Sequence, residues 1–240
     1  MRPAFVQTSH VFLFSLLVGT TALTAQHAVA TEKPRSGKPA NADTMDIVEN
    51  IRSRYARSGD FRARFVQTTA HKLFAGKLER AYGELFFKRG GRMRWEYTRP
   101  ERKLFVYDGA TLWIYEPDVP QVFRGAAELE RFRRALAFLG GEARLSDDYT
   151  VERQPAERFG FAGHVLALYP KDRRSSFRYI EVYVNKDDYQ VVRSVIVDRE
   201  GNRNRFDFSP TQSGEALSDS LFSFTPPAGV PVIDANGAGL

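Results

Sequence analysis

The sequence predicts a mainly β (α+β) protein in which a meandering antiparallel sheet curls toward a barrel. Short segments rich in β-branched and aromatic residues follow one another from Phe61 onward, and turn sequences such as Gly90-Gly91 and Asp108-Gly109 separate them. No repeat or second linker divides this region, so one domain over residues 44–240 is the simplest organisation. The chain has no cysteine, so its stability must come from its core and not from disulfides.

The N-terminal 30 residues have the pattern of a secretory signal peptide. Arg2 is the only charged residue among them, an apolar run covers Val11–Val18, and Ala28-Val29-Ala30 matches an A-x-A cleavage site. A membrane anchor is the alternative, but the apolar run is shorter than the roughly 20 residues that a spanning helix needs. We therefore expect residues 1–30 to be removed after about Ala30, leaving an exported protein that begins at Thr31.

A polar, proline- and lysine-rich stretch over residues 31–43 predicts a flexible linker. Asp43 or Thr44 can then cap a first helix that ends at Ser58-Gly59. Its apolar face consists of Ile47, Val48, Ile51 and Tyr55.

After this helix the pattern is nearly all β. We expect strands around 61–69, 78–88, 92–98, 103–108, 111–116, 120–124, 148–153, 164–169, 177–185, 190–198 and 203–208.

The segment Leu104–Tyr115 predicts a β-hairpin whose turn lies at Asp108-Gly109. Both faces of both strands are apolar: Leu104 and Val106 alternate with aromatic residues in the first strand, as Leu112 and Ile114 do in the second. An antiparallel sheet over an ordinary core alternates apolar with polar residues. The second apolar face must therefore meet another layer or a ligand.

One helical segment, residues 126–139, interrupts the strands and ends at Gly140-Gly141. Leu129, Phe132 and Leu136 lie on one stripe of it. The segment is either a core helix or a lid over a cavity whose other wall is the apolar sheet; an amphipathic helix on a membrane surface is a third alternative.

No pattern of residues indicates catalysis, a metal or a cofactor. After the signal peptide only His71 and His164 remain, far apart in the sequence, and there is no nucleophile elbow, P-loop or dinucleotide fingerprint. The formal net charge of +6 is compatible with nucleic acid, an anionic membrane or an acidic partner. Export makes nucleic acid the least favoured of these.

Several short motifs, in order over about residues 44–232, together resemble the periplasmic lipoprotein carrier family, LolA. They are Phe65–Gln67, Gly83–Arg89, Met93–Tyr97 with Pro100, Val106–Tyr115, Pro117, Gln121-Val122 and Phe222–Val230. The resemblance implies an incomplete, strongly curved antiparallel barrel that an α-helical lid closes over a hydrophobic cavity. It also implies a carrier without cofactor or catalysis, which takes acylated lipoproteins from an inner-membrane ABC transporter (LolCDE-like) to an outer-membrane receptor (LolB-like), and which we expect to be a monomer.

The resemblance also assigns candidate site residues. Arg89 matches the arginine that latches the lid in the empty state, although Gly90 replaces the proline that usually follows it. The candidate cavity-wall residues are Trp95, Tyr97, Leu104, Val106, Leu112, Ile114, Leu129, Phe132 and Leu136. Because both sheet faces are apolar, alternation does not decide which face lines the cavity.

Three other functions are compatible with the same residues. A periplasmic lipid- or lipopeptide-sensing or transfer domain on the same half-barrel is the main alternative. A secreted lipid hydrolase would need a nucleophile beside His71 or His164, and a purely structural envelope protein would carry no lipid.

Overall fold

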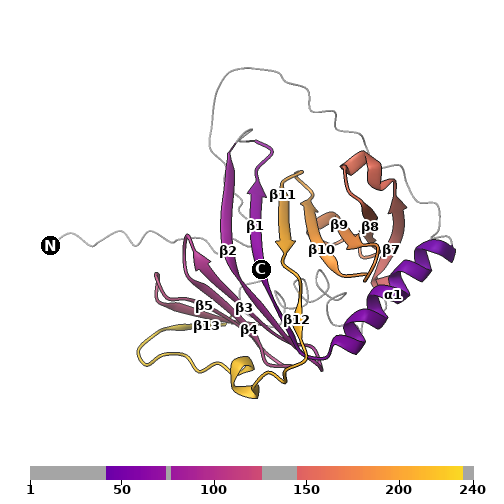
Figure 1. Cartoon of the computed structure of the whole chain (residues 1–240). Helices are drawn as coiled ribbons and strands as arrows, with labels where there is room; N and C mark the ends of the chain where they lie inside the picture. Colours follow the sequence, from indigo (N-terminus) through magenta and orange to yellow (C-terminus); the bar gives the residue numbers. More distant parts are fainter. Residues whose placement is uncertain (1–41, 74–76, 126–144, 235–240) are drawn as a thin grey trace. The chain divides into compact units, whose positions relative to one another are not determined.

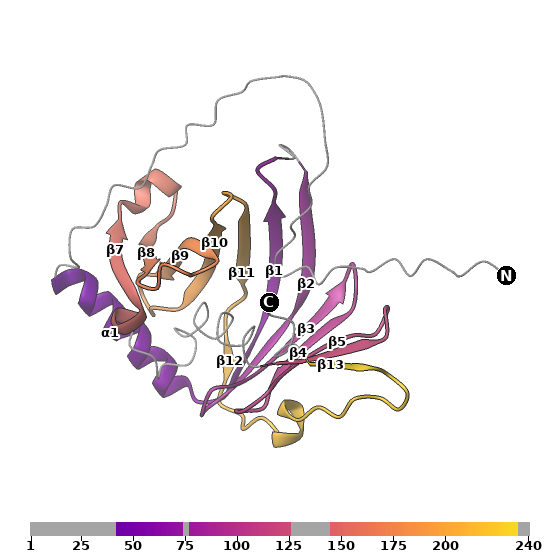
Figure 2. The same cartoon turned by 180° about the vertical axis from the view of Figure 1, so that it is seen from behind.

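The computed structural model describes residues 42–73, 77–125 and 145–234, and most of them form one curved sheet (Figures 1 and 2). The strands are β1 (Phe61–Ala70), β2 (Leu78–Lys88), β3 (Arg92–Arg99), β4 (Lys103–Tyr107), β5 (Leu112–Glu116), β6 (Gln121–Gly125), β7 (Tyr149–Gln154), β8 (Gly163–Pro170), β9 (Phe177–Asn185), β10 (Val191–Asp198), β11 (Arg203–Phe208), β12 (Gln212–Ser213) and β13 (Val232–Asp234). The helices are α1 (Ala42–Ser58), the short α3 (Leu145–Asp148), and the 3-10 turns η1 (Ala156–Phe159) and η2 (Asp219–Phe222).

The strand order is β13-β6-β5-β4-β3-β2-β1-β11-β10-β9-β8-β7, with β12 paired to β1 beside this path. Neighbouring strands are antiparallel except for β13, which pairs parallel to β6. The predicted mainly β, antiparallel, incomplete barrel is therefore confirmed, and each predicted strand is present with ends that differ by at most about two residues. The predicted lid of residues 126–139 and the signal peptide lie outside the described residues, as do residues 31–41 of the predicted linker. The last two residues of that linker, 42 and 43, belong to helix α1, which begins one residue before the predicted cap Asp43.

The first helix, α1, ends at Gly59, whose φ of 66° is the left-handed conformation that glycine adopts readily. All four predicted apolar residues of this helix are buried. The Tyr55 ring lies 5.5 Å from the Phe61 ring, and its hydroxyl oxygen accepts a hydrogen bond from the Val191 N–H at 3.2 Å. Burial raises the pKa of Tyr55 to about 12, so this contact is made by a neutral phenol.

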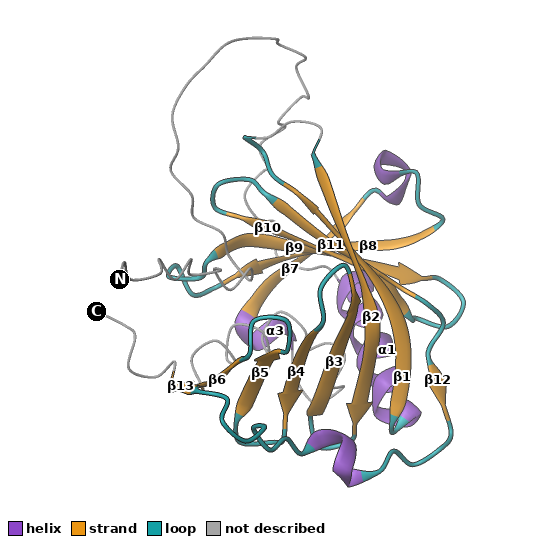
Figure 3. Cartoon of the chain, turned by 90° about the vertical axis from the view of Figure 1, so that its left-hand side faces the viewer, coloured by secondary structure: helices purple, strands orange, loops and turns teal. Residues whose placement is uncertain are grey.

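We call the sheet face against which α1 packs the inner face, and the opposite one the outer face. Residues directly opposite in an antiparallel pair point to the same face. Phe61 and Phe65 lie on the inner face of β1, and the register continues that face through Trp95 and Phe105 to Ile114. Figure 3 shows α1 crossing this side of the strands.

The hairpin β4–β5 forms as predicted, but its loop spans four residues, 108–111. The Asp108 carboxylate accepts hydrogen bonds from the N–H groups of Ala110 and Thr111, both at 2.8 Å. Gly109 has a φ of 107°. The Asp-Gly pair therefore sets the turn, with the aspartate side chain closing it in place of a two-residue backbone turn.

The protein itself covers the outer face of this hairpin. Val106 and Trp113 are paired there, and the Phe224 ring lies 5.8 Å from Trp113 and 5.7 Å from Tyr115. Phe222 is only 1% exposed. The C-terminal segment (residues 214–234) is therefore the second layer that the doubly apolar hairpin requires.

Candidate apolar binding site

An aromatic cluster lies on the inner face where β4, β3, β2, β1 and β11 run side by side, with its rings on all of these strands except β2. The Phe65 ring is its centre, with ring-centre distances of 4.9 Å to both Trp95 and Tyr97. Phe206 lies 5.6 Å from Trp95, and Phe105 lies 5.8 Å from Tyr97. These distances are typical of edge-on and tilted aromatic pairs, which are favoured over face-to-face stacking.

The cluster forms because Gly83 lies directly opposite Phe65 in the β1–β2 register. A Cβ atom on Gly83 would lie 2.6 Å from Cζ of Phe65 and 2.1 Å from the Glu96 carbonyl oxygen. The missing side chain therefore leaves room for the Phe65 ring at Gly83, from where it reaches Trp95 and Tyr97 of β3.

Apolar residues extend the inner face on both sides of the cluster. Toward β6 they include Leu112 and Ile114, and toward β7 they include Val182, Leu166 and Leu168, all nearly fully buried. Such an interior offers apolar groups dispersion contacts and removal from water.

Tyr97 brings a phenol group into the cluster beside Phe65. Burial raises its pKa well above that of a free tyrosine. The cluster therefore remains uncharged across the physiological pH range.

The structure separates the predicted wall residues into three groups. Trp95, Tyr97, Leu112 and Ile114 lie together on the inner face. Leu104 and Val106 lie on the outer face, paired with Tyr115 and Trp113. Leu129, Phe132 and Leu136 lie outside the described residues. The alternation of residues in the hairpin did not determine which of its faces is the inner one. The register of β3 with β4 determines it.

The same surface contains four phenylalanines that were not predicted as wall residues: Phe65, Phe105, Phe206 and Phe208. Phe65 and Phe208 are paired across β1 and β11, although they are far apart in the sequence. Two features of the sequence could have indicated Phe65. Phe61 and Phe65 occupy positions of β1 that point to the same face, and a glycine lies in the middle of the neighbouring strand.

The predicted latch residue Arg89 follows β2, and both its backbone and its side chain are held near the end of α1. Its N–H donates to Asp60 Oδ1 at 3.0 Å, and its guanidinium donates to the Ala56 carbonyl oxygen at 3.4 Å. An arginine at the C-terminal end of a helix is favoured by the helix dipole. Its planar fork carries five N–H donors, so further acceptors can be bound from the same position.

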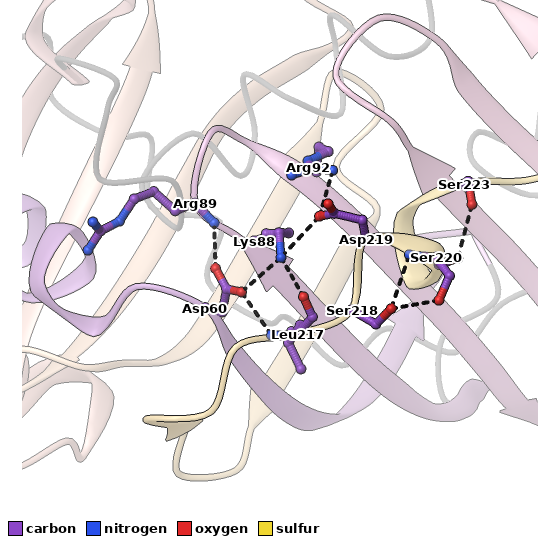
Figure 4. Close-up of polar contacts among 9 residues, drawn as sticks. All are labelled: Asp60, Lys88, Arg89, Arg92, Leu217, Ser218, Asp219, Ser220 and Ser223. Carbon is purple, nitrogen blue, oxygen red and sulfur yellow. Dashed lines mark hydrogen bonds and ion pairs between the residues drawn. The ribbon is translucent and has the colours of Figure 1, made fainter.

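Lys88, beside it, joins three segments that are distant in the sequence (Figure 4). Its ammonium donates to Asp60 Oδ2 at 3.3 Å and to the Leu217 carbonyl, and it pairs with Asp219 at 3.1 Å. The Asp60 carboxylate also accepts the Leu217 N–H at 2.9 Å. Lys88 and Asp60 thus attach the C-terminal segment to the α1–β1 turn.

Burial alone would raise the pKa of Asp60, but the N–H groups of Arg89 and Leu217 and the Lys88 ammonium lower it by more. Asp60 is therefore ionised at neutral pH, as the attachment requires.

The two histidines lie in different surroundings: His71 Nε2 is 4.0 Å from the Glu79 carboxylate, on the β1–β2 hairpin. His164 stacks on Tyr189 at 5.9 Å, and burial, followed by the charge of Arg153, lowers its pKa. In the described part of the chain no group of three or more His, Cys, Asp and Glu side chains is arranged to hold a metal ion. No helix in the same ranges is long and apolar enough to cross a membrane.

Comparison with known proteins gives a consistent set of matches. A family model described as "Outer membrane lipoprotein carrier protein LolA" matches residues 57–225. The outer-membrane lipoprotein carrier protein of Chromobacterium violaceum is 33% identical over 200 residues, which are 82% of this chain and 91% of that protein. That of Neisseria meningitidis serogroup B is 30% identical over 169 residues, covering 70% and 78%. Among solved structures, a LolA superfamily protein of Nitrosomonas europaea covers 75% of this chain and 97% of its own, with a TM-score of 0.44 and 15% identity.

Proposed function

Because this chain belongs to the LolA family of outer-membrane lipoprotein carrier proteins, we propose that its inner face binds the acyl chains of the lipoproteins it carries. The name of the family describes a carrier and not an enzyme, and it gives lipoproteins as the cargo. The aromatic cluster around Phe65 is the observation that supports the acyl-chain site. On the outer face, the apolar side chains of β4 and β5 are already covered by the C-terminal segment, so the inner face is the better candidate for cargo.

A carrier is needed because of the size of the hydrophobic effect. Each acyl methylene buried from water contributes about 0.8 kcal/mol, so a lipidated protein leaves a bilayer slowly unless another apolar site receives its chains. Broad aromatic side chains supply such a site without a fixed hydrogen-bonding pattern. The site can therefore accept lipoproteins whose protein parts differ.

The proposal also includes export, loading, unloading and the oligomeric state of the carrier. The signal peptide of residues 1–30 directs the chain to the periplasm and is removed. A LolCDE-like ABC transporter of the inner membrane loads the carrier, and a LolB-like receptor of the outer membrane unloads it. The carrier works as a monomer.

Arg89 is the proposed latch of the empty state. Two observations support this proposal. Arg89 lies at the end of α1, where its guanidinium donates to the Ala56 carbonyl oxygen. The other N–H groups of its guanidinium form no ion pair with a carboxylate of the described residues. The predicted lid, residues 126–139, is the segment it would hold.

The two tryptophans of the chain allow a direct test, because Trp95 lies on the inner face and Trp113 on the outer face. The full-length chain is exported and purified as Trp113→Phe, which keeps Trp95, and as Trp95→Phe, which keeps Trp113. A triacylated lipopeptide with brominated acyl chains is then added, since bromine quenches tryptophan only at close range.

We expect strong quenching of Trp95 and little quenching of Trp113, together with a one-to-one complex when the carrier is expressed beside a tagged triacylated lipoprotein. Equal quenching of both tryptophans would reject the inner face as the site. Copurification of free phospholipid without lipoprotein would favour the lipid-sensing or transfer alternative.

A further inference from the structure

The tip of the β1–β2 hairpin exposes two leucines to solvent. Leu73 is 86% exposed and Leu78 is 57% exposed, the two highest values among the large apolar residues of the described ranges. Hairpin tips usually carry small or polar turn residues. Two exposed leucines at one tip therefore indicate an apolar contact made outside the fold.

Basic side chains surround the two leucines. Lys72 and Lys77 are their neighbours in the sequence, and Arg80 follows Leu78 on the outer face of β2; all three are exposed. On the adjacent strand Arg99 is exposed and lies 4.6 Å from the centre of the Tyr82 ring. We call Lys72, Leu73, Lys77, Leu78, Arg80 and Arg99 the hairpin-tip patch.

Most acidic groups near the patch are already engaged. Glu79 pairs with Lys77 at 3.0 Å and lies 4.0 Å from His71. Asp198 accepts the N–H groups of Gly201 and Asn202 in the neighbouring β10–β11 turn. Among the described residues no carboxylate is paired with Lys72, Arg80 or Arg99. Two exposed acids, Glu200 beside Gly201 and Glu101 two residues after Arg99, reduce the net positive charge.

The patch has a fixed place on the sheet. β1 and β2 are paired up to Ala70 and Leu78, and the Lys72 N–H donates to the Asn202 side-chain oxygen at 3.0 Å. The leucines therefore project from the end of a continuous ladder, next to the β10–β11 turn.

From this combination we propose that the hairpin-tip patch docks the protein on the surface of an anionic phospholipid bilayer. The leucines enter the interface, while the lysines and arginines bind the anionic headgroups. A hairpin tip presents much less than the roughly 800 Å² per partner that a stable protein interface buries, whereas a bilayer needs no complementary shape. Docking of this kind is weak and reversible, as a protein that must leave each membrane requires.

The proposal is tested by flotation of the exported protein, without cargo, with vesicles of phosphatidylethanolamine and phosphatidylglycerol. We expect the Leu73→Ser/Leu78→Ser variant to lose about tenfold in partitioning. Lys72→Gln should lose roughly fivefold, and added salt should weaken binding of the parent protein. The matched control is Met45→Ser, since Met45 is an apolar residue of α1 that is 38% exposed, and it should partition like the parent.

No partitioning of the parent protein, or equal partitioning of the leucine variant, would overturn the proposal. Equal partitioning onto uncharged phosphatidylcholine vesicles would also overturn the part assigned to the basic residues. The leucine variant should still show bromine quenching of Trp95, so failure of docking and failure of acyl-chain binding are distinguished.

Discussion

At the scale of single residues, Gly83 determines whether the aromatic cluster can form. We expect Gly83→Ala to lower the free energy of unfolding by about 2–3 kcal/mol, because the new Cβ would overlap the Glu96 carbonyl and the Phe65 ring. The midpoint of urea denaturation measures this. Tryptophan emission should change as well, since Phe65 packs against Trp95.

Gly90→Ala is the matched control for that substitution. Gly90 has a φ of 89° and open space around it, so alanine there meets only backbone strain of about 1–2 kcal/mol. Equal losses for both variants, with an unchanged Trp95 emission, would contradict the steric role of Gly83.

Asp60 gives the fold a dependence on pH. Its pKa is lowered in the folded state, so its contribution is complete above its unfolded pKa of about 4 and is lost as the pH falls through the lower, folded value. We expect Asp60→Asn to destabilise the protein by about 1–2 kcal/mol at neutral pH. The difference from the parent should shrink below about pH 4.

Denaturation curves at pH 7 and at about pH 3 test this, with Asp187→Asn as the control because Asp187 is an exposed turn residue. A difference between Asp60→Asn and the parent that stays constant over this range would show that the carboxylate's charge is not what attaches the C-terminal segment.

At the scale of elements, the C-terminal segment acts as the second layer over β4 and β5. Phe224 covers Trp113 on the outer face, so Phe224→Ala should expose that indole and shift its emission to longer wavelength when measured in the Trp95→Phe background. In the Trp113→Phe background the same substitution should leave the emission of Trp95 unchanged. A shift of Trp95 instead would mean that the segment acts on the inner face.

The elements also show how far the sequence leads. Strands of five or more residues were predictable because alternation and turn residues mark them. Phe177–Asn185 and Val191–Asp198 are examples. β12 and β13 were not, because two or three residues carry no period and their pairing is decided by partners far away in the chain. That four of the nine predicted wall residues lie together on the inner face could not be predicted either. The register between β3 and β4, and not the hairpin sequence, determines which residues point to that face.

At the scale of the whole described unit, the single sheet has apolar side chains packed on both of its faces. On the outer face the chain covers itself, with Phe224 over β5 and the η1 region packing Phe161 at 5.3 Å from the Tyr183 ring. On the inner face α1 covers part of the surface, and its Tyr55 is tied to Val191. Because the apolar parts of the outer face at β5 and β9 are covered by the chain itself, the inner face can take an exchangeable ligand while the sheet keeps its structure.

This division predicts that cargo stabilises the folded chain. A ligand that binds only the native state adds RT ln(1 + [L]/Kd), which is about 2.7 kcal/mol when its concentration is about 100 times Kd. A triacylated lipopeptide should therefore raise the melting temperature of the exported protein, and a lipopeptide without acyl chains should not. Tyr97→Asp places a charge in the aromatic cluster, so it should abolish the increase. Tyr115→Asp is the comparison on the outer face: it should lower the melting temperature of the empty protein but keep the increase with lipopeptide, and loss of the increase in both variants would contradict an inner-face site.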